Sequence, residues 1–482
     1  MNTSSPYTKI ALFILSISLS ATLAKSANAM ECPGLGWSEG LANYLKPDAK
    51  MPVDDTKTIP TPDCNFHEWS WEAFAWATAL DKKGIPRFLS MQTPEDLLST
   101  KVKSTKAKPV LKLAGRSLLP FGSPGFKEGA SAIVEADGNM LVAPNGYPVY
   151  ASVHMNPTYF ATAKKNLIAT NGYNTQPTDG YFSLGDAVFK ATWLRLDQGQ
   201  AAPQGAYTTQ AEVPVLSVLR TKNQYTVVTS SNTVTVTVAL VGLHVVGYTV
   251  NHPEFLWATF EHNLNSPATA DNTFDTSGSN SGNFTFYATN TPYTQVNQPN
   301  PPQSNQSYTP PQLMFNPLTQ KFTPSNNAVQ ENATGGENQE GGPANVTALN
   351  ASAQSFFAGQ KGGESAFANY HLIGTVWMLP NTYVLPNALT MDQTSAVGSI
   401  SLANTTAETF VQAAKNSPPN ALLNCFLCHN ATSYNFQNPP PEKLASRRIA
   451  ISHVLGVGTA YAVPNLLTVP IARDPNAPVS VR

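Results

Sequence analysis

The run Thr233-Val-Thr-Val-Thr-Val constrains the fold more than any other feature of this 482-residue chain. Threonine and valine alternate in it, so hydroxyl groups point to one side and methyl groups to the other, which is typical of a half-buried β-strand. The run lies inside a longer β segment, Tyr225 to Val250, whose apolar second half predicts a more fully buried strand. We therefore expect a β sheet at the centre of the protein.

Tight turns and further strand patterns surround this segment. Asp137-Gly138 and Asn145-Gly146 separate short apolar runs, and both dipeptides favour hairpins because they tolerate the positive φ angles of tight turns. A largely antiparallel sheet follows from these signals. The further predicted strands are Val188 to Leu196, Phe255 to His262 and Tyr370 to Met378.

Helices are predicted near both ends of the chain. Apolar residues at helical spacing predict a tryptophan-rich core helix over His67 to Leu80. Thr405-Thr406-Ala407-Glu408 has the pattern of a capping box, in which Thr405 caps a helix that runs to about Lys415 and Glu408 reaches back. A final helix is predicted from about Glu442 to Leu455. The fold class is therefore α+β.

The N-terminus has the pattern of a cleaved signal peptide over residues 1–29. Lys9 precedes the apolar run Ile10 to Leu23, and Ala27-Asn28-Ala29 gives a small-x-small cleavage pattern. A short membrane anchor is the alternative, but the run is shorter than the roughly 20 residues that a spanning helix needs. We expect a periplasmic or secreted protein without an integral membrane span.

The rest of the chain divides into three predicted parts. Residues 30–109 form an N-terminal helical segment, 110–400 a β-rich core, and 401–482 a C-terminal helical segment. Residues 264–352 are rich in Asn, Gln, Pro, Thr, Gly and Ser, which predicts a low-complexity insertion made of loops. This insertion could be a binding surface or simply a tolerated addition.

The charge of the chain limits which classes of partner it can bind, and its cysteines fall into two pairs. Only 12% of residues are charged and the formal net charge is −1, which argues against nucleic acid or an anionic membrane as a partner, because both need basic patches. Cys32 and Cys64 could form a disulfide near the mature N-terminus, worth roughly 3–4 kcal/mol in the chain-entropy treatment. The remaining two cysteines belong to a different pattern.

Asn424-Cys425-Phe426-Leu427-Cys428-His429 contains the pattern C-x-x-C-H. Two thiols three positions apart on a helical turn can meet the two vinyl groups of one haem, and the adjacent histidine then lies under the iron. A zinc site would need further ligands, a thioredoxin-like pair would sit early in a βαβ unit, and a plain disulfide would be strained. We expect one covalent haem c, bound by Cys425, Cys428 and His429.

The second axial ligand of the iron is not fixed by this motif. Only 53 residues follow His429, and they contain no methionine and one histidine, His453. His453 lies on the predicted final helix and is the favoured sixth ligand, with a core or surface histidine as the alternative reading. Upstream, His262 is a weaker candidate. His244 and His371 lie on predicted strands and are interpreted as hydrogen-bonded core histidines.

Several strings of the chain together resemble exported bacterial proteins of the cytochrome c family, a group whose function is uncharacterised. The match runs from about Phe66 to His429, with the Asn- and Pro-rich insertion as a poor fit. The resemblance implies that the haem motif belongs to one large β-rich unit, and it directs attention to Trp257–Asn263 as the upstream segment beside the haem. The strings are Trp69–Phe74, Val153–Pro157, Phe189–Trp193, Leu240–His244, Trp257–Asn263, Leu372–Trp377 and Asn404–Thr409.

The functional expectation is an exported mono-haem electron carrier that meets an unidentified redox partner protein. Covering a haem takes more than 53 residues, so we expect walls from the upstream core. A haem enzyme or small-ligand sensor with an open sixth position, such as a peroxidase, is one alternative. A surface binding protein with a structural haem is another. The pattern favours electron transfer over catalysis.

Overall fold

The computed structural model is an α+β structure whose core is dominated by a sheet. It describes residues 32, 37–55, 64–94, 96, 111–113, 140–169, 182–221, 224–252, 254–268, 283–299, 311, 313–332, 334, 342–378, 396–412, 425–428, 467–470 and 479–481. The helices in these ranges are η1 (Trp37–Asn43), α1 (Cys64–Thr78), η2 (Arg87–Ser90), α3 (Pro157–Ala169), η3 (Tyr293–Gln295), α4 (Gly342–Ala358), η4 (Gly362–Asn369), α5 (Thr409–Gln412) and α6 (Cys425–Cys428).

Within the described residues, nine strands form one sheet in which neighbouring strands are mostly antiparallel. Its path is β1-β4-β5-β6-β9-β10, while β3 pairs with β5, β2 with β3, and β11 with β5. A second, three-stranded sheet has the order β12-β7-β8. The strands are β1 (Leu111–Lys112), β2 (Tyr150–Met155), β3 (Ala187–Arg195), β4 (Thr208–Thr221), β5 (Gln224–Gly247), β6 (Leu256–His262), β7 (Leu313–Asn316), β8 (Lys321–Thr323), β9 (Tyr370–Met378), β10 (Ala396–Gly398), β11 (Leu467–Pro470) and β12 (Val479–Val481).

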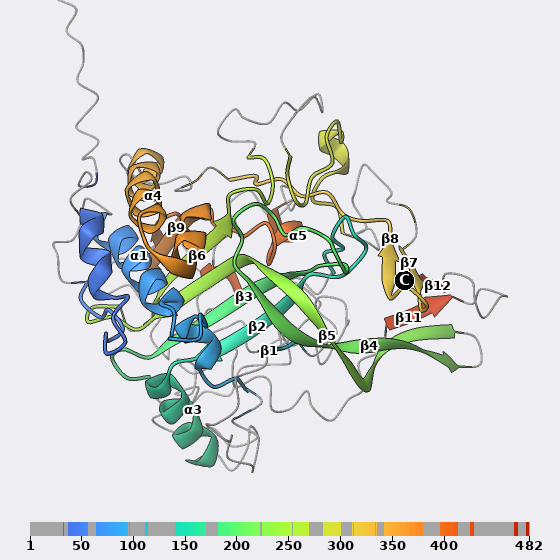
Figure 1. Ribbon diagram of the computed structural model, residues 1–482, viewed down its shortest axis with the longest axis horizontal. Coiled ribbons are helices and arrows are strands. Elements are labelled where there is room, and N and C mark those ends of the chain that lie inside the picture. The colour runs from blue at the N-terminus through green and yellow to red at the C-terminus, as the bar shows by residue number, and fades with distance from the viewer. Residues whose placement is uncertain are drawn as a thin grey trace, which may run out of the picture.

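Strand β5 organises the large sheet, as the threonine–valine alternation predicted. It is one continuous strand of 24 residues, whose first part pairs with β4 and whose second part lies between β3 and β6 (Figure 1). The predicted strands over 188–196, 255–262 and 370–378 are confirmed as β3, β6 and β9. The Asn145-Gly146 turn is confirmed too, because Gly146 has a positive φ and the flanking Val142 and Pro148 form a bridge.

The two faces of the sheet carry different layers. On one face, which we call the α1 face, Phe189, Val245 and Phe260 pack with the aromatic residues of α1. Helix α4 packs beside α1, as the blue and orange helices of Figure 1 show. The opposite face, the α6 face, carries Val188, Val246 and Trp257, against which α6 packs. Because side chains alternate along a strand, consecutive residues of β5 and of β6 point to opposite faces of the sheet.

The segment 264–352 differs from the expectation of loops alone. It contains η3, β7, β8 and the first part of α4, and it buries Phe286, Phe315 and Phe322. The rings of Phe315 and Phe322 lie 4.7 Å apart and face each other across β7 and β8. A few aromatic residues therefore hold an otherwise polar segment onto the core. The average composition of the segment does not reveal them, because they are few.

The C-terminal region also differs from the expectation of helices. Strands β11 and β12 add to the two sheets, and Figure 1 places them beside β7 and β8 at the end of the β4–β5 ribbon. Their short patterns carry no strong strand signal. The predicted helix Glu442–Leu455 and the predicted signal peptide 1–29 lie outside the described residues. Among the residues that the structure does describe, none of the helices combines the length and apolarity needed to cross a bilayer.

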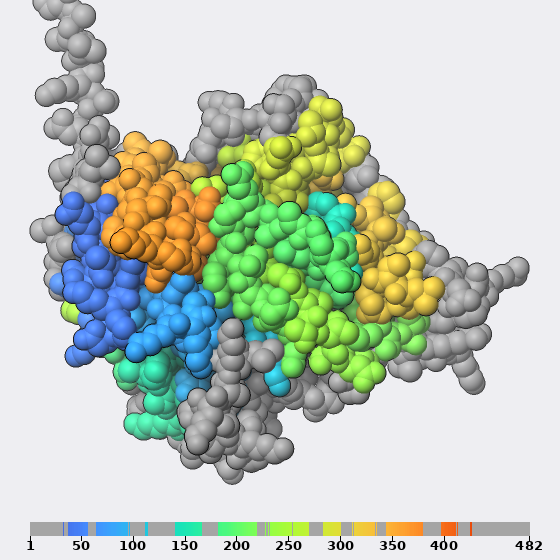
Figure 2. Space-filling model, viewed as in Figure 1, coloured from blue at the N-terminus to red at the C-terminus, as the bar shows by residue number. Residues whose placement is uncertain are grey.

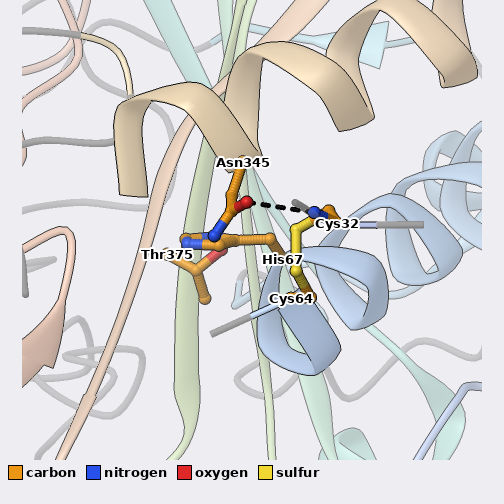
Figure 3. Close-up of a disulfide and its surroundings, with 5 residues drawn as sticks. All are labelled: Cys32, Cys64, His67, Asn345 and Thr375. Atoms are coloured by element: carbon orange, nitrogen blue, oxygen red, sulfur yellow. Dashed lines mark hydrogen bonds between the residues drawn. A yellow bond between two sulfur atoms is a disulfide. The ribbon is translucent and has the colours of Figure 1, made fainter. Parts of the chain in front are cut away.

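The expected disulfide is confirmed. Cys32 and Cys64 are bonded, with their Cα atoms 5.3 Å apart, and Cys64 is the first residue of α1. The backbone N–H of Cys32 donates to Oδ1 of Asn345 on α4, over 3.0 Å (Figure 3). The bridge and this hydrogen bond therefore fasten Cys32 to two helices of the α1 face.

Replacing both Cys32 and Cys64 with serine is expected to lower the free energy of unfolding by roughly 3–4 kcal/mol, because the unfolded chain regains the freedom of the opened loop. Urea unfolding followed by circular dichroism measures this loss. Reducing agent should destabilise the wild-type protein by a similar amount and leave the double variant unchanged. A loss below about 1 kcal/mol would show that the bridge adds little.

Candidate functional site

The two cysteines of the C-x-x-C-H motif begin and end α6, a single helical turn. Positions 425 and 428 therefore share one face of the helical turn, as attachment of one haem requires. Cys425 is half-buried. His429 and His453 lie outside the described residues, as does the side chain of Cys428.

Phe426 holds α6 against the sheet. Its side chain is 1% exposed, and its ring lies edge-on to Trp257 of β6 at a centroid distance of 6.3 Å. Trp257 is itself fixed, because its indole N–H donates to the carbonyl oxygen of Glu254 over 3.1 Å. The segment Trp257–Asn263, which the family resemblance singled out, thus supplies the residue next to the motif. The cluster around Phe426 also includes Met155, Tyr159, Phe182, Phe255, Ile373, Met378 and Leu402.

His262 lies away from this place. Trp257 points to the α6 face, whereas His262, five residues further along β6, contacts Tyr370 of the α1 face. Its Nε2–H donates to the carbonyl of Gln204 at 3.1 Å, and its Nδ1 accepts from the N–H of Leu264 at 3.2 Å. Burial lowers the pKa of His262 to about 4. The structure therefore does not bring His262 together with α6.

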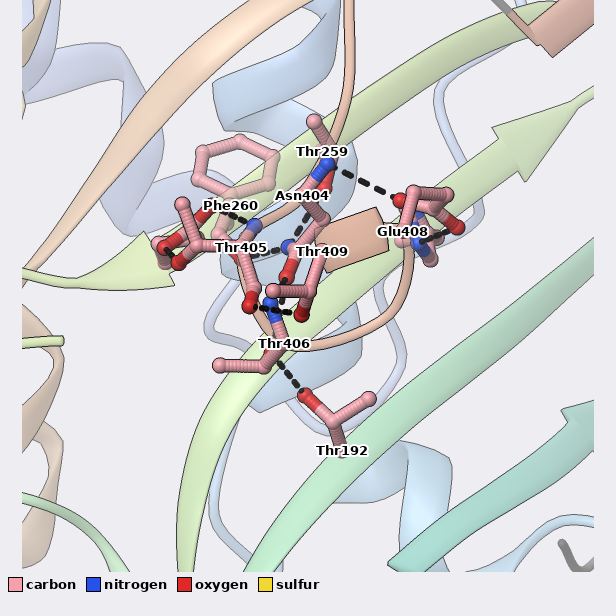
Figure 4. A network of polar contacts seen from close by, with 10 residues as sticks. Thr192, Thr259, Phe260, Asn404, Thr405, Thr406, Glu408 and Thr409 are labelled. Carbon is pink, nitrogen blue, oxygen red and sulfur yellow. Dashed lines mark hydrogen bonds and ion pairs between the residues drawn. The ribbon is translucent and has the colours of Figure 1, made fainter. Parts of the chain in front are cut away.

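A network of buried polar side chains lies beside the apolar cluster, where the segment 402–409 crosses the α6 face (Figure 4). Its centre is Glu261, which is 2% exposed. The carboxylate accepts the backbone N–H of Thr405 at 2.6 Å, the hydroxyl of Thr405, and Nδ2 of Asn265 at 3.0 Å. Burial raises the pKa of Glu261, although these hydrogen bonds oppose the shift.

Asn404 joins the crossing segment to β6. Its amide donates to Oγ1 of Thr259 at 2.8 Å and to the carbonyl of Phe260 at 3.1 Å, while its Oδ1 accepts the N–H of Thr406. The predicted capping box is therefore not formed. Oδ1 of Asn404 closes a turn over residues 404–406, and Glu408 accepts the N–H of Asn404 rather than that of Thr405. The hydroxyl of Thr405 instead donates to the buried carboxylate of Glu261. Helix α5 begins only at Thr409.

Gly242 allows the crossing segment to touch the backbone of β5. A Cβ atom at this position would lie 2.5 Å from Oγ1 of Thr192 and 2.6 Å from Oγ1 of Thr406. Those two hydroxyls are hydrogen-bonded to each other over 2.6 Å (Figure 4). The glycine therefore leaves room for a threonine–threonine contact that ties β3 to the segment before α5.

His244 and Glu408 form a close pair at the edge of this network. Nε2 of His244 lies 3.1 Å from Oε1 of Glu408. The distance fits an ion pair between the two side chains. Burial raises the pKa of Glu408. The nearby His244 and Lys190 lower it by more than burial raises it, so the pKa of Glu408 lies below its usual value.

The Thr405→Val variant is expected to lower the free energy of unfolding by about 2–3 kcal/mol, because it removes a hydroxyl donor from the buried carboxylate of Glu261 without changing the side-chain volume. Denaturant unfolding measures the change. In a Glu261→Gln background, which carries no charge to stabilise, the same substitution should cost clearly less. Equal losses in the two backgrounds would contradict this role for Thr405.

The sequence contains a signal for these residues that is not a motif. Lys190, His244 and Glu261 each interrupt an otherwise apolar strand, and a charged or ionisable residue in such a place needs partners. The partners come from a segment more than 140 residues later in the chain, which the strand pattern cannot reveal.

Within the described part of the chain, no group of three or more His, Cys, Asp and Glu residues is placed to hold a metal ion. His429, which the sequence predicts as an iron ligand, lies outside that part. Comparison with protein-family models, with curated proteins and with solved structures finds no match to this chain.

Proposed function

We propose that this protein is an exported c-type cytochrome with one covalent haem, which carries electrons to or from a redox partner protein. The observation that supports this most is the C-x-x-C-H motif, whose first four residues form a helical turn that Phe426 packs against Trp257. Such a turn is the local geometry that haem attachment requires. The haem iron would supply one-electron redox chemistry, and the chain would supply the attachment and the apolar walls.

The surroundings of α6 suit a large apolar cofactor. Buried side chains of the sheet such as Met155, Val246 and Ile373 belong to the apolar cluster there, and they come from strands upstream of the motif. An apolar environment around a haem favours the less charged, ferrous state of the iron and limits access of water. The expectation that upstream residues wall the haem is thereby supported.

Export is supported by two features of the chain. The first 29 residues have the pattern of a signal peptide, and c-type haem is attached outside the cytoplasm. The bonded pair Cys32–Cys64 belongs to an oxidising compartment as well. A periplasmic or secreted location follows from the proposal.

Expression together with a c-type maturation system tests the proposal. The pyridine haemochrome assay should give one covalent haem per chain, and Cys425→Ala together with Cys428→Ala should abolish it. The Cys32→Ser, Cys64→Ser variant is the matched control, because it removes two cysteines without touching the motif and should keep its haem. A colourless wild-type protein from a competent host would refute the proposal.

The optical spectrum separates the electron carrier from a haem enzyme or sensor. An electron carrier should be low-spin with both axial positions filled by the protein, so CO and cyanide should leave its spectrum unchanged. His429 supplies one ligand in this proposal, and His453 is the sequence-based candidate for the other. A high-spin spectrum that shifts when CO is added would favour an enzyme or sensor instead.

A further inference from the structure

Residues 402–412, which we call the strap, cross the α6 face and precede α6 in the chain. Two side chains anchor the strap by apolar contacts, because Leu402 and Phe410 pack in two separate buried clusters. Between these anchors, Asn404 and Thr405 are fully buried and are hydrogen-bonded to β6 (Figure 4). Most of the strap is therefore held by contacts that solvent does not reach.

One contact of the strap differs from the others. Glu408 is the only charged residue of the strap, and among the strap side chains that the structure describes it alone is half-buried rather than buried. It meets His244 of β5, with 3.1 Å between Nε2 and Oε1, and the two side chains are 22% and 12% exposed. Solvent therefore reaches this pair, so its charge can respond to the pH.

The described residues place few other ionisable groups around the pair. Lys190 on β3 is the cross-strand neighbour of His244, Glu261 on β6 interacts electrostatically with Glu408, and His371 on β9 lies beyond Glu261. Burial raises the pKa of Glu408, but the nearby His244 and Lys190 lower it by more. Glu408 therefore stays ionised between pH 5 and 8, the range in which histidine side chains generally change their charge.

We propose that the His244–Glu408 pair is a pH-sensitive latch that holds the strap closed on the α6 face. When His244 carries a proton, an imidazolium faces the ionised carboxylate of Glu408. When it does not, Lys190 is the cation that remains beside this carboxylate in the described part of the chain. The closed strap thus favours the proton on His244, and by linkage the proton favours the closed strap. Raising the pH increases the fraction of molecules in which the strap is open.

The latch couples pH to the surroundings of the C-x-x-C-H motif. The closed strap covers the carboxylate of Glu261, to which Thr405 donates its backbone N–H. It also fixes the chain that leads from α5 to Cys425. Opening therefore admits water to the buried network and loosens the connection to α6.

Hydrogen exchange of the full-length protein, followed by mass spectrometry, tests the latch. Local opening of the strap is measured as the protection of its backbone amides relative to an unstructured chain. Between pH 6 and pH 8 this protection should fall about tenfold, which corresponds to a difference of one pKa unit between the closed and open strap. Protection of β9, which opens only with the whole fold, should not fall over the same range.

Three variants separate the charge of His244 from its size. His244→Gln should remove the pH dependence and leave the strap at pH 6 about as weakly protected as the wild-type strap at pH 8. His244→Lys keeps a positive charge over the whole range and should hold the protection high at both pH values. If His244→Gln does not fold, Glu408→Gln removes the other half of the pair and should likewise remove the pH dependence. His154→Gln is the matched control, because His154 is a buried β-strand histidine that packs on Phe88 at the α1 face, and it should behave as the wild type.

Three results would overturn the latch. The first is a wild-type strap with the same protection at pH 6 and pH 8. The second is a fall in protection that β9 shares, because the opening would then not be confined to the strap. The third is a His244→Gln protein that keeps the pH dependence of the wild type. None of these measurements uses the haem, so failure of the latch is distinguishable from failure of the proposed function.

Discussion

Lowering the pH from 6.5 to 4 is expected to reduce the free energy of unfolding by roughly 5–7 kcal/mol, because two buried histidines resist protonation in the folded protein. His67 and His262 are 0% and 1% exposed. Burial lowers the pKa of His67 to about 3 and that of His262 to about 4, from 6.5. Each group therefore costs about 1.4 kcal/mol for every pH unit over this range.

The sign follows from which state binds more protons. Above pH 6.5 both histidines are neutral in the folded and unfolded chains, and their contribution to stability is complete. Below pH 6.5 the unfolded chain takes up protons that the folded chain refuses, so stability is lost as pH falls toward the folded pKa values. Glu261 acts in the opposite direction, because burial raises its pKa and the stability that its carboxyl contributes is lost as pH rises.

Urea unfolding curves at several pH values between 7 and 4 measure this loss. His67→Gln and His262→Gln should each reduce the slope of stability against pH by about 1.4 kcal/mol per unit, since each removes one titrating group. Burial, together with the neighbouring His262, lowers the pKa of His371 to about 4 as well, so His371→Gln should reduce the slope in the same direction. A stability that does not change between pH 6.5 and 5 would contradict the prediction.

The sheet could be predicted from the sequence because its signals are local. A few residues are enough to predict β5 and β6. The threonine–valine alternation of β5 and the aromatic run of β6 indicate both that a strand forms and which of its sides is buried. Helix α1 was predicted for the same reason, since its tryptophan and alanine spacing is helical. Strands β11 and β12 have four and three residues, and they pair with β5 and β7, which lie far earlier in the chain, so their own short patterns could not reveal them.

The same difference applies to the candidate site: a pattern within a few residues could be predicted, and contacts between distant residues could not. The spacing of Cys425 and Cys428 marked the motif, because attachment chemistry acts over one helical turn. The network of Glu261, Asn404 and Glu408 could not be predicted, because its hydrogen bonds join residues more than 140 positions apart. The capping interpretation failed there, because Thr405 donates its hydroxyl to the buried carboxylate of Glu261 and the helix begins only at Thr409.

The aromatic layer between α1 and the sheet carries the second large prediction. Trp71 is fully buried, and its ring lies 5.2 Å from that of Phe74 and 4.9 Å from that of Phe260 on β6. Its indole N–H donates to Oδ1 of Asn350 on α4 over 3.1 Å, and Nδ2 of Asn350 donates to the carbonyl of Leu372 on β9. One side chain thus joins two helices and the sheet.

Trp71→Ala is therefore expected to lower the free energy of unfolding by about 3–5 kcal/mol, from lost apolar burial and from the cavity that remains. Trp71→Phe should cost less, because it keeps most of the ring contacts and loses the hydrogen bond to Asn350. Leu318→Ala is the control, since Leu318 is 76% exposed and should change stability by less than about 0.5 kcal/mol. Denaturant unfolding compares the three variants. The haem that we propose at α6 should persist in Trp71→Ala, because α6 packs on the opposite face of the sheet. A Trp71→Ala loss no larger than that of Leu318→Ala would mean that α1 is not fastened to the core in this way.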